Sequence, residues 1–286
     1  MTSRNTTDRK AVNYAFALMK KDHSKHHRLF PPTRVLALLS AIVLGIIASG
    51  CKTQPAPQTA APSPPHQFIS KKTGKSFTYV IVADMDAEHE RFEIPHGLFR
   101  PSKDNFAGTD RKAAKTSVSD APPTTRADVA ELLANLPASD DQMLNHNPPI
   151  SKSADSDRVI EEQQNVVVLN GFIYAVAKES DNDYHVILGT APGGPGQYVN
   201  VEISGLPASG PFRAPLRDVR TKFQDFFGST IAGSGYHKFT GNPIPVRITG
   251  SLFYDIDHPP GAVGPADTKP QTAWEIHPVT DIEFEP

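Results

Sequence analysis

The sequence feature that most constrains the fold is a long alternating stretch, Asn165–Leu188. A β-branched run, Val166–Val168, continues through Gly171 into alternating apolar residues and then reaches a polar cluster, Glu179–Asp183. β-Branched and aromatic residues favour strands, and a polar cluster between two such runs is typical of a hairpin turn. The stretch therefore predicts a β-hairpin whose second strand begins at Tyr184.

Later segments predict three further strands and one helix. Gln197–Ile203, Ile244–Ile256 and Trp274–Phe284 are rich in alternating β-branched and aromatic residues, which favours strands. Arg213–Phe227 carries apolar residues at helical spacing and is followed by glycine, a common helix stop. Five strands with a helix between the third and the fourth resemble the OB-fold. We therefore expect a mainly β protein built on a small OB-like five-stranded barrel; a sandwich or an irregular α+β sheet is the alternative.

Two glycines fall inside the predicted strands, Gly171 in the first and Gly250 in the fourth. The strands of a small barrel must coil sharply, and glycine tolerates the backbone geometry of a bulge. We therefore expect a bulge at each glycine.

The N-terminal part has the pattern of an export signal. Val35–Ser49 is uncharged, and its fifteen residues are fewer than the about 20 that span a membrane. Basic residues precede it, and small residues lead to Cys51, the only cysteine. This pattern resembles the bacterial lipoprotein signal, which implies an exported chain anchored by lipid at Cys51 in the cell envelope. In that family Lys52 is compatible with the outer membrane of a Gram-negative cell. An uncleaved signal anchor is the alternative, and Met19 is a second candidate start.

The chain between the signal and the barrel is polar and rich in proline at first, and its later elements are short. Phe77–Val82 and Arg91–Ile94 predict a hairpin. Residues 126–136 predict an amphipathic helix capped by Thr125. The expected organisation is a signal peptide over 1–50, a disordered tether over 51–66, a poorly ordered extension over 67–160 and the barrel over 161–286.

Composition excludes some classes of protein. The formal net charge is −2, which argues against a protein that grips nucleic acid by releasing counterions. One cysteine among 286 residues excludes a disulfide framework, and 27 prolines suit extended linkers. We expect the membrane to be reached through the N-terminal lipid, and the partner to be an envelope glycan or protein.

Acidic residues and histidines recur where the predicted strands begin and end. Asp181–His185, Gly250–His258 and Glu275–Val279 resemble motifs of a group of uncharacterised bacterial secreted proteins and lipoproteins with an OB-like C-terminal domain. The resemblance covers residues 160–286 and implies no particular activity. The candidate residues for a ligand site or a polar network are Glu179, Asp181, Asp183, His185, Glu202, Asp255, His258, Glu275 and His277.

Carboxylates and imidazoles together suit a divalent metal, and mixed oxygen and nitrogen ligands favour zinc, manganese or iron over calcium. Asp183 and His185 share one strand face, as do Glu275 and His277, because side chains alternate along a strand. These four are the candidate metal ligands. Turn hydrogen bonds and cross-strand ion pairs would employ the same residues without a metal. We therefore expect no cofactor, with a divalent metal as the alternative.

The predicted function is a non-enzymatic binding or interaction module, with Tyr174, Tyr184 and Tyr198 as candidates for a stacking surface. The alternative is a metal-dependent hydrolase or a thermonuclease-like phosphodiesterase on an OB barrel. Asp181–Tyr184 and Glu202 superficially resemble the calcium site of thermonuclease-like enzymes. However, no arginine lies between them, and phosphoryl chemistry needs positive charge at the developing anion.

Overall fold

The computed structural model describes residues 64–83, 104–231 and 235–286. The predicted signal, Cys51, most of the tether and the predicted strand Arg91–Ile94 lie outside these residues. Within the described part of the chain, no helix has both the length and the apolar character needed to cross a membrane.

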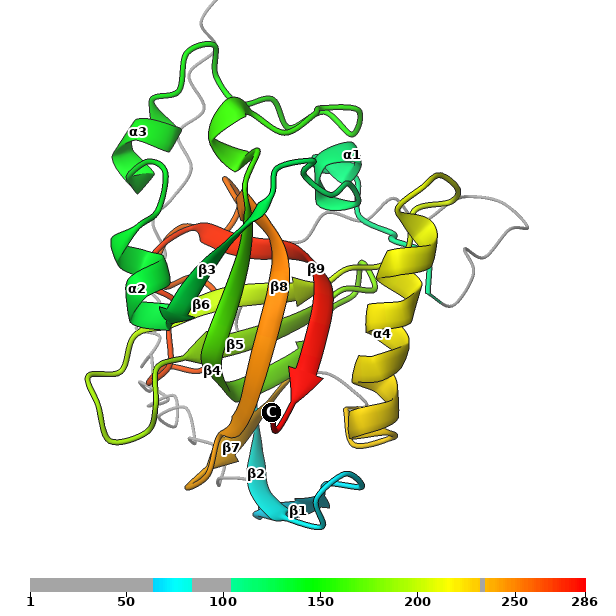
Figure 1. The fold of residues 1–286 in the computed structure, drawn as a ribbon, viewed down its shortest axis with the longest axis vertical. Helices are drawn as coiled ribbons and strands as arrows, with labels where there is room; N and C mark the ends of the chain where they lie inside the picture. Colours follow the sequence, from blue (N-terminus) through cyan, green and yellow to red (C-terminus); the bar gives the residue numbers. More distant parts are fainter. Residues whose placement is uncertain (1–63, 84–103, 232–234) are drawn as a thin grey trace, which may run out of the picture. The chain divides into compact units, whose positions relative to one another are not determined.

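Five strands close into a barrel (Figure 1). Neighbours pair in the order β4, β5, β6, β9 and β8, and β8 then pairs with β4. The β6–β9 pair is parallel, and the other four pairs are antiparallel. The prediction of a mainly β chain with a closed five-stranded barrel is therefore confirmed. The barrel strands are β4 (Asn165–Lys178), β5 (Tyr184–Gly189), β6 (Tyr198–Ile203), β8 (Ile244–Tyr254) and β9 (Trp274–Phe284).

Both glycines inside the strands lie at irregularities, as predicted. The register of β4 against β8 shifts between Val168 and Gly171, and that of β8 against β9 shifts on either side of Gly250. A Cβ at Gly250 would lie 2.6 Å from the backbone oxygen of Pro278. Glycine is therefore required there, because two strand backbones approach too closely for a side chain to fit between them.

Helix α4 (Arg213–Phe227) follows β6 and packs on the barrel beside β9 (Figure 1). Its helical spacing buries Phe223 and Phe227 in the same apolar core as the barrel interior. After α4 comes β7 (Tyr236–Thr240), a strand that the sequence pattern did not indicate. β7 pairs with β2 (Ser76–Val82), which forms a hairpin with β1 (His66–Ile69). These three strands extend the sheet beyond the closed barrel.

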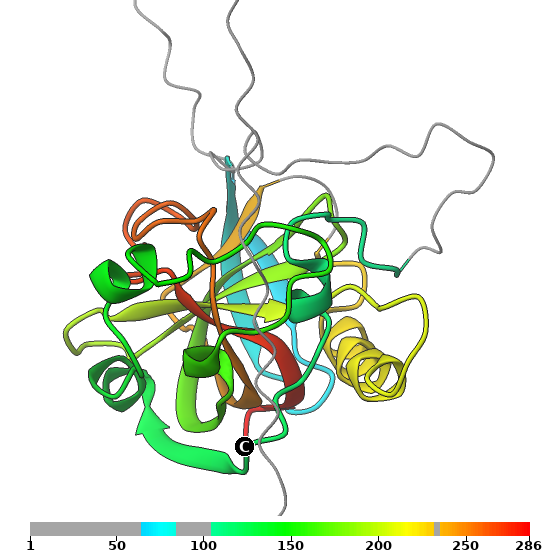
Figure 2. The same cartoon turned by 90° about the horizontal axis from the view of Figure 1, so that it is seen from above.

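Residues 104–162 hold four short helical segments and one strand. β3 (Pro123–Asp128) pairs in parallel with β4, and α2 (Val129–Ala134) follows it directly. The prediction that Thr125 caps the helix is wrong, because Thr125 lies in β3. Asp128 caps α2 instead, by accepting the Glu131 backbone N–H at 2.9 Å. Figures 1 and 2 show α2 and α3 on the opposite side of the barrel from α4. The remaining segments are α1 (Lys112–Lys115), α3 (Asp140–Leu144) and a 3-10 turn, Ile160–Glu162.

Candidate functional site

The predicted site residues lie on the outer face of the barrel wall, beneath segments that cover it. Along β5, Tyr184 and Leu188 face the main apolar core. His185 therefore lies on the other face, which it shares with Ile187 of a second, smaller apolar cluster. Glu202 on β6 is the direct cross-strand neighbour of His185, so it projects from the same outer face.

All nine predicted residues are buried, and none exposes more than 6% of its surface. They come from the turn between β4 and β5, from β5 and β6, from the chain that leaves β8, and from the start of β9. The fold therefore brings together residues that are up to about a hundred positions apart in the chain. They are Glu179, Asp181, Asp183, His185, Glu202, Asp255, His258, Glu275 and His277.

Basic side chains form part of the cover. The Arg111 guanidinium lies 4.6 Å from the ring centroid of Phe253, and the Lys115 ammonium lies 5.7 Å from it. Arg158 lies over the same ring at 5.8 Å. Arg111 also forms a bidentate ion pair with buried Glu162 at 2.7 and 2.8 Å. Three cations thus lie over the Phe253 ring on β8, and one of them, Lys115, also reaches the acidic cluster at Asp255.

Glu202 is the centre of the cluster. One of its oxygens lies 3.1 Å from His185 Nε2, and the other lies 2.8 Å from His277 Nδ1. Burial acts to raise the pKa of Glu202, but the neighbouring His277 and His185 hold that pKa well below its usual range. Glu202 is therefore a carboxylate shared by two imidazoles.

His277 links Glu202 to Asp183, whose Oδ2 lies 3.4 Å from His277 Nε2. Burial acts to lower the pKa of His277, but the carboxylates around it, Glu202 first, raise that pKa to about 10. Burial and the nearby Asp181 raise the pKa of Asp183 well above its ordinary value. Asp183 also accepts the backbone N–H of Gly205, which fixes the end of β6 to the start of β5.

Asp255 joins α1 to the chain that follows β8, through ion pairs with Lys115 and His258. Its Oδ2 lies 3.1 Å from the Lys115 ammonium and 3.2 Å from His258 Nδ1. Burial acts to raise the pKa of Asp255, but these two cations hold it well below its usual range. Burial acts to lower the pKa of His258, and Asp255 raises it to about 9.

Glu275 has more distant cationic neighbours than Glu202 or Asp255. Its Oε1 accepts a hydrogen bond of 2.9 Å from Asn200, whose amide also donates to Glu202 at 3.0 Å. Its Oε2 is buried and has no hydrogen-bond partner among the described residues. The nearest ion-pair contact of Oε2 is His277 Nδ1, at 3.8 Å. Burial and the charge of Glu202 raise the pKa of Glu275 to about 7.

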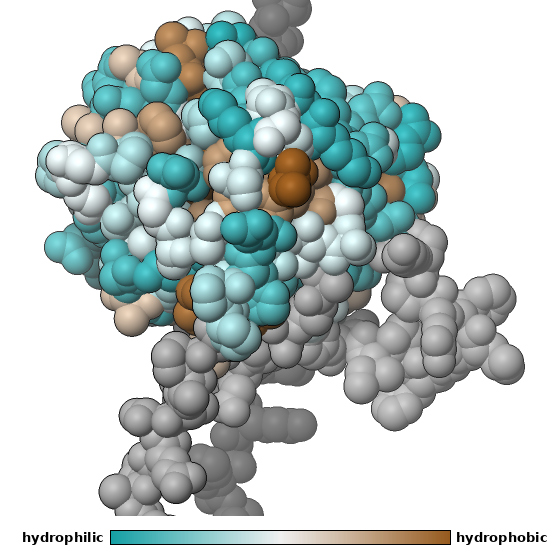
Figure 3. Space-filling model, turned by 90° about the horizontal axis from the view of Figure 1, so that it is seen from below, coloured by the Kyte–Doolittle hydropathy of each residue, from teal (hydrophilic) through white to brown (hydrophobic). Residues whose placement is uncertain are grey.

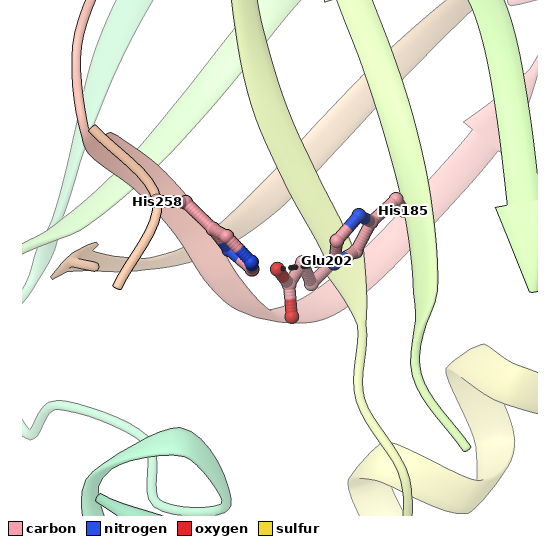
Figure 4. A group of neighbouring side chains, drawn as sticks. All are labelled: His185, Glu202 and His258. Atoms are coloured by element: carbon pink, nitrogen blue, oxygen red, sulfur yellow. Dashed lines mark ion pairs between the residues drawn. The ribbon is translucent and has the colours of Figure 1, made fainter. Parts of the chain in front are cut away.

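Three overlapping groups in the described chain hold ligand atoms within 4.8 Å of one another. Glu202 belongs to all three, and Figure 4 shows its carboxylate between the rings of His185 and His258. Of the four ligands proposed from the sequence, Asp183 and His277 share one group, whereas His185 and Glu275 belong to the other two, so no single group contains all four. The groups are His185 with Glu202 and His258; Glu202 with Asp255, His258 and Glu275; and Asp183 with Glu202 and His277.

Sequence reasoning missed Asn200, Lys115 and Tyr236. Asn200 precedes Glu202 by two positions and faces Glu275 in the parallel β6–β9 register, so strand alternation carried a signal for it. Tyr236 offers its hydroxyl to His185 Nδ1 at 3.1 Å, and Lys115 reaches Asp255. No local pattern marks these two, because long-range packing brings them to the cluster.

The remaining candidate residues take part in turn hydrogen bonds, ion pairs and packing. Asp181 caps the β4–β5 turn by accepting the Asp183 N–H at 2.9 Å, and Glu179 Oε1 lies 3.6 Å from His185 Nδ1. Tyr184 packs on Phe223 in the core, so it is not available for stacking. Tyr174 and Tyr198 meet edge to face at 5.1 Å, outside the barrel interior.

The fold and the cluster define a closed β-barrel protein with a buried acid–imidazole network on its outer wall. No protein family, curated protein or solved structure matched the chain in three comparisons.

Proposed function

We propose that this protein is a lipid-anchored binding module of the bacterial cell envelope, without catalytic activity. The N-terminal sequence supports the anchor, since basic residues and a short apolar segment lead to Cys51. An OB-like barrel is supported by the strand order, by the parallel β6–β9 pair and by α4 between the third and fourth barrel strands.

The proposal that the protein binds a ligand rests on a groove of about 480 Å³. It lies between the α2–α3 segment and the chain before β9, and apolar Leu133 and Leu136 form part of its lining. Three amides, Gln142, Gln197 and Gln271, line it too. Gln142 Oε1 accepts the Ser139 N–H and Gln271 Nε2 donates to Gly196 O. The remaining amide donors and acceptors match the hydroxyl groups of an uncharged glycan.

The burial of the carboxylate–imidazole cluster favours a binding function over catalysis. Its carboxylates and imidazoles are buried beneath Lys115 and the chain after β8, where a bulky substrate makes no contact with them. The face in Figure 3 is mainly hydrophilic or neutral, with brown limited to small separate spots. That face is therefore suited to water and polar ligands rather than to a broad apolar partner.

The second candidate is a metal-dependent hydrolase, which the three carboxylate–imidazole groups favour. Calcium-dependent cleavage of DNA or RNA by the purified chain, lost in Glu202→Gln, would establish that candidate in place of the binding module.

The anchor is tested by metabolic labelling with a palmitate analogue and by membrane fractionation. We expect the wild-type chain to carry the label and to sediment with membranes. Cys51→Ser should lose the label and move to the soluble fraction. A label that persists in Cys51→Ser would contradict the anchor.

The ligand is tested by co-sedimentation of the chain, in detergent, with purified peptidoglycan. We expect Gln197→Ala/Gln271→Ala to weaken binding about tenfold or more, because two hydrogen bonds of about 1 kcal/mol each are lost. Gln67→Ala is the matched control, since this exposed glutamine lies on β1 outside the groove. Equal binding of peptidoglycan by both variants would exclude the groove as the glycan site. If the chain binds an envelope protein and not peptidoglycan, the ligand is a protein.

A further inference from the structure

One group of buried ligand atoms lies where three segments of the barrel wall meet. Glu202 lies next to the end of β6, Glu275 lies next to the start of β9, and Asp255 and His258 follow β8. Each offers a ligand atom, and these four atoms lie within 4.8 Å of one another. In a tetrahedral zinc site the ligand atoms are about 3.3–3.6 Å apart, because each bond is about 2.0–2.2 Å long. Small side-chain movements would therefore bring all four onto one ion.

The second observation is the buried oxygen of Glu275. Glu275 is only 2% exposed, and its Oε2 has no hydrogen-bond partner among the described residues. Leaving a buried carboxylate oxygen without a partner is unfavourable, because the group has lost its water. Lys115 is paired with Asp255 at 3.1 Å and His277 with Glu202 at 2.8 Å, whereas the Glu275 contact with His277 is 3.8 Å. Among the three carboxylates of this group, Glu275 is therefore the one with the most distant cation.

We infer that the protein binds one divalent transition-metal ion between the barrel wall and its cover, with Glu202, Asp255, His258 and Glu275 as ligands. Carboxylate oxygens alone would suit calcium or magnesium, but an imidazole in the set favours zinc, manganese or iron. All four ligands are at most 5% exposed. The site therefore has the character of a closed structural site.

Asn200 supports this assignment because it hydrogen-bonds to two of the proposed ligands. Its Nδ2 donates to Oε1 of both Glu202 and Glu275, at 3.0 and 2.9 Å. Such a donor orients the two carboxylates, which is the usual role of a side chain behind metal ligands, and it leaves Oε2 of Glu275 for an ion. The ion would link β6, β9 and the chain after β8, and so strengthen the closure of the barrel.

The competing explanation is that the Lys115 ammonium alone compensates the charge of these carboxylates and that no metal ion binds. Metal content of the full-length chain in detergent distinguishes the two. After treatment with EDTA and dialysis, the chain is given Zn²⁺ or Mn²⁺, and bound metal is measured by mass spectrometry of the elements. We expect one equivalent per chain and a higher thermal midpoint with metal. Less than a tenth of an equivalent, with an unchanged midpoint, would overturn the proposal.

Two matched variants locate the ion. Glu275→Gln keeps the shape of a ligand and removes its charge, so we expect bound metal to fall below detection. Asp183→Asn makes the same kind of change in the same buried network but outside the four ligands, so we expect it to keep one equivalent. Retention in Glu275→Gln, or loss in Asp183→Asn alone, would contradict the assignment.

A spectroscopic measurement on the wild-type chain does not depend on the folding of either variant. Mn²⁺ bound by these four residues should show electron spin-echo modulation from one imidazole nitrogen, that of His258. Modulation from two imidazoles would place the ion between His185 and His258, and none would remove His258 from the ligands. Either result would overturn the assignment.

Discussion

The ammonium of Lys115 on α1 lies 3.1 Å from Oδ2 of Asp255, and both side chains are buried. This ion pair joins the chain before β3 to the chain after β8. It fixes α1 to the outer face of the barrel and brings a positive charge to the acidic cluster.

Lys115→Met should destabilise the protein by about 3–5 kcal/mol, because it leaves the buried Asp255 without its main counter-charge. Lys115→Met/Asp255→Asn should recover most of that loss. The free energy of unfolding, from denaturant titration with EDTA present, measures both. The exposed pair Arg247–Glu283 is the control, and Arg247→Met should cost about 0–1 kcal/mol. Equal effects of Lys115→Met and Arg247→Met would contradict a buried ion pair.

Gly250→Ala should destabilise the barrel by about 1–3 kcal/mol, because the added Cβ meets backbone that cannot move aside. The Cβ would lie 2.6 Å from Pro278 O and 2.5 Å from Ile276 Cγ2. At Gly194 the nearest atom is Ala191 O at 3.5 Å, so Gly194→Ala should change stability by less than about 0.5 kcal/mol. Thermal unfolding of the two variants checks the difference, and a neutral Gly250→Ala would mean that the strands separate easily there.

Asp128→Ala should cost about 1 kcal/mol, because Asp128 caps α2 and satisfies the Glu131 N–H. Thr125→Ala changes an exposed side chain in β3 and should cost less than about 0.5 kcal/mol. Chemical unfolding of both variants compares the two residues. A larger effect at Thr125 would restore the cap that the sequence suggested.

Asn200→Leu should weaken binding of Zn²⁺ by about 10–100-fold, if Asn200 orients the carboxylates of Glu202 and Glu275 for a metal. Isothermal titration of the EDTA-treated chain measures the change. Asn242→Leu, at an exposed position, is the control and should bind as the wild type does. An unchanged affinity in Asn200→Leu would show that the two carboxylates need no such support.

Much of the fold was predictable because it rests on local periodicity. The alternation in Asn165–Leu188 specifies β4 and β5, and the helical spacing in Arg213–Phe227 specifies α4. β7 was missed because it is only five residues long and pairs with β2, about 160 positions earlier in the chain. Its identity as a strand depends on that distant partner.

The sequence alone determined the residue types of the cluster, because strand alternation placed Asp, Glu and His side by side on the faces of predicted strands. Only the tertiary structure decided which face is covered, which of the residues share a ligand group and that Lys115 and Tyr236 join them. The physical reason is that a strand's periodicity defines two faces but not their neighbours. Burial and charge compensation arise only when distant segments pack against one of those faces.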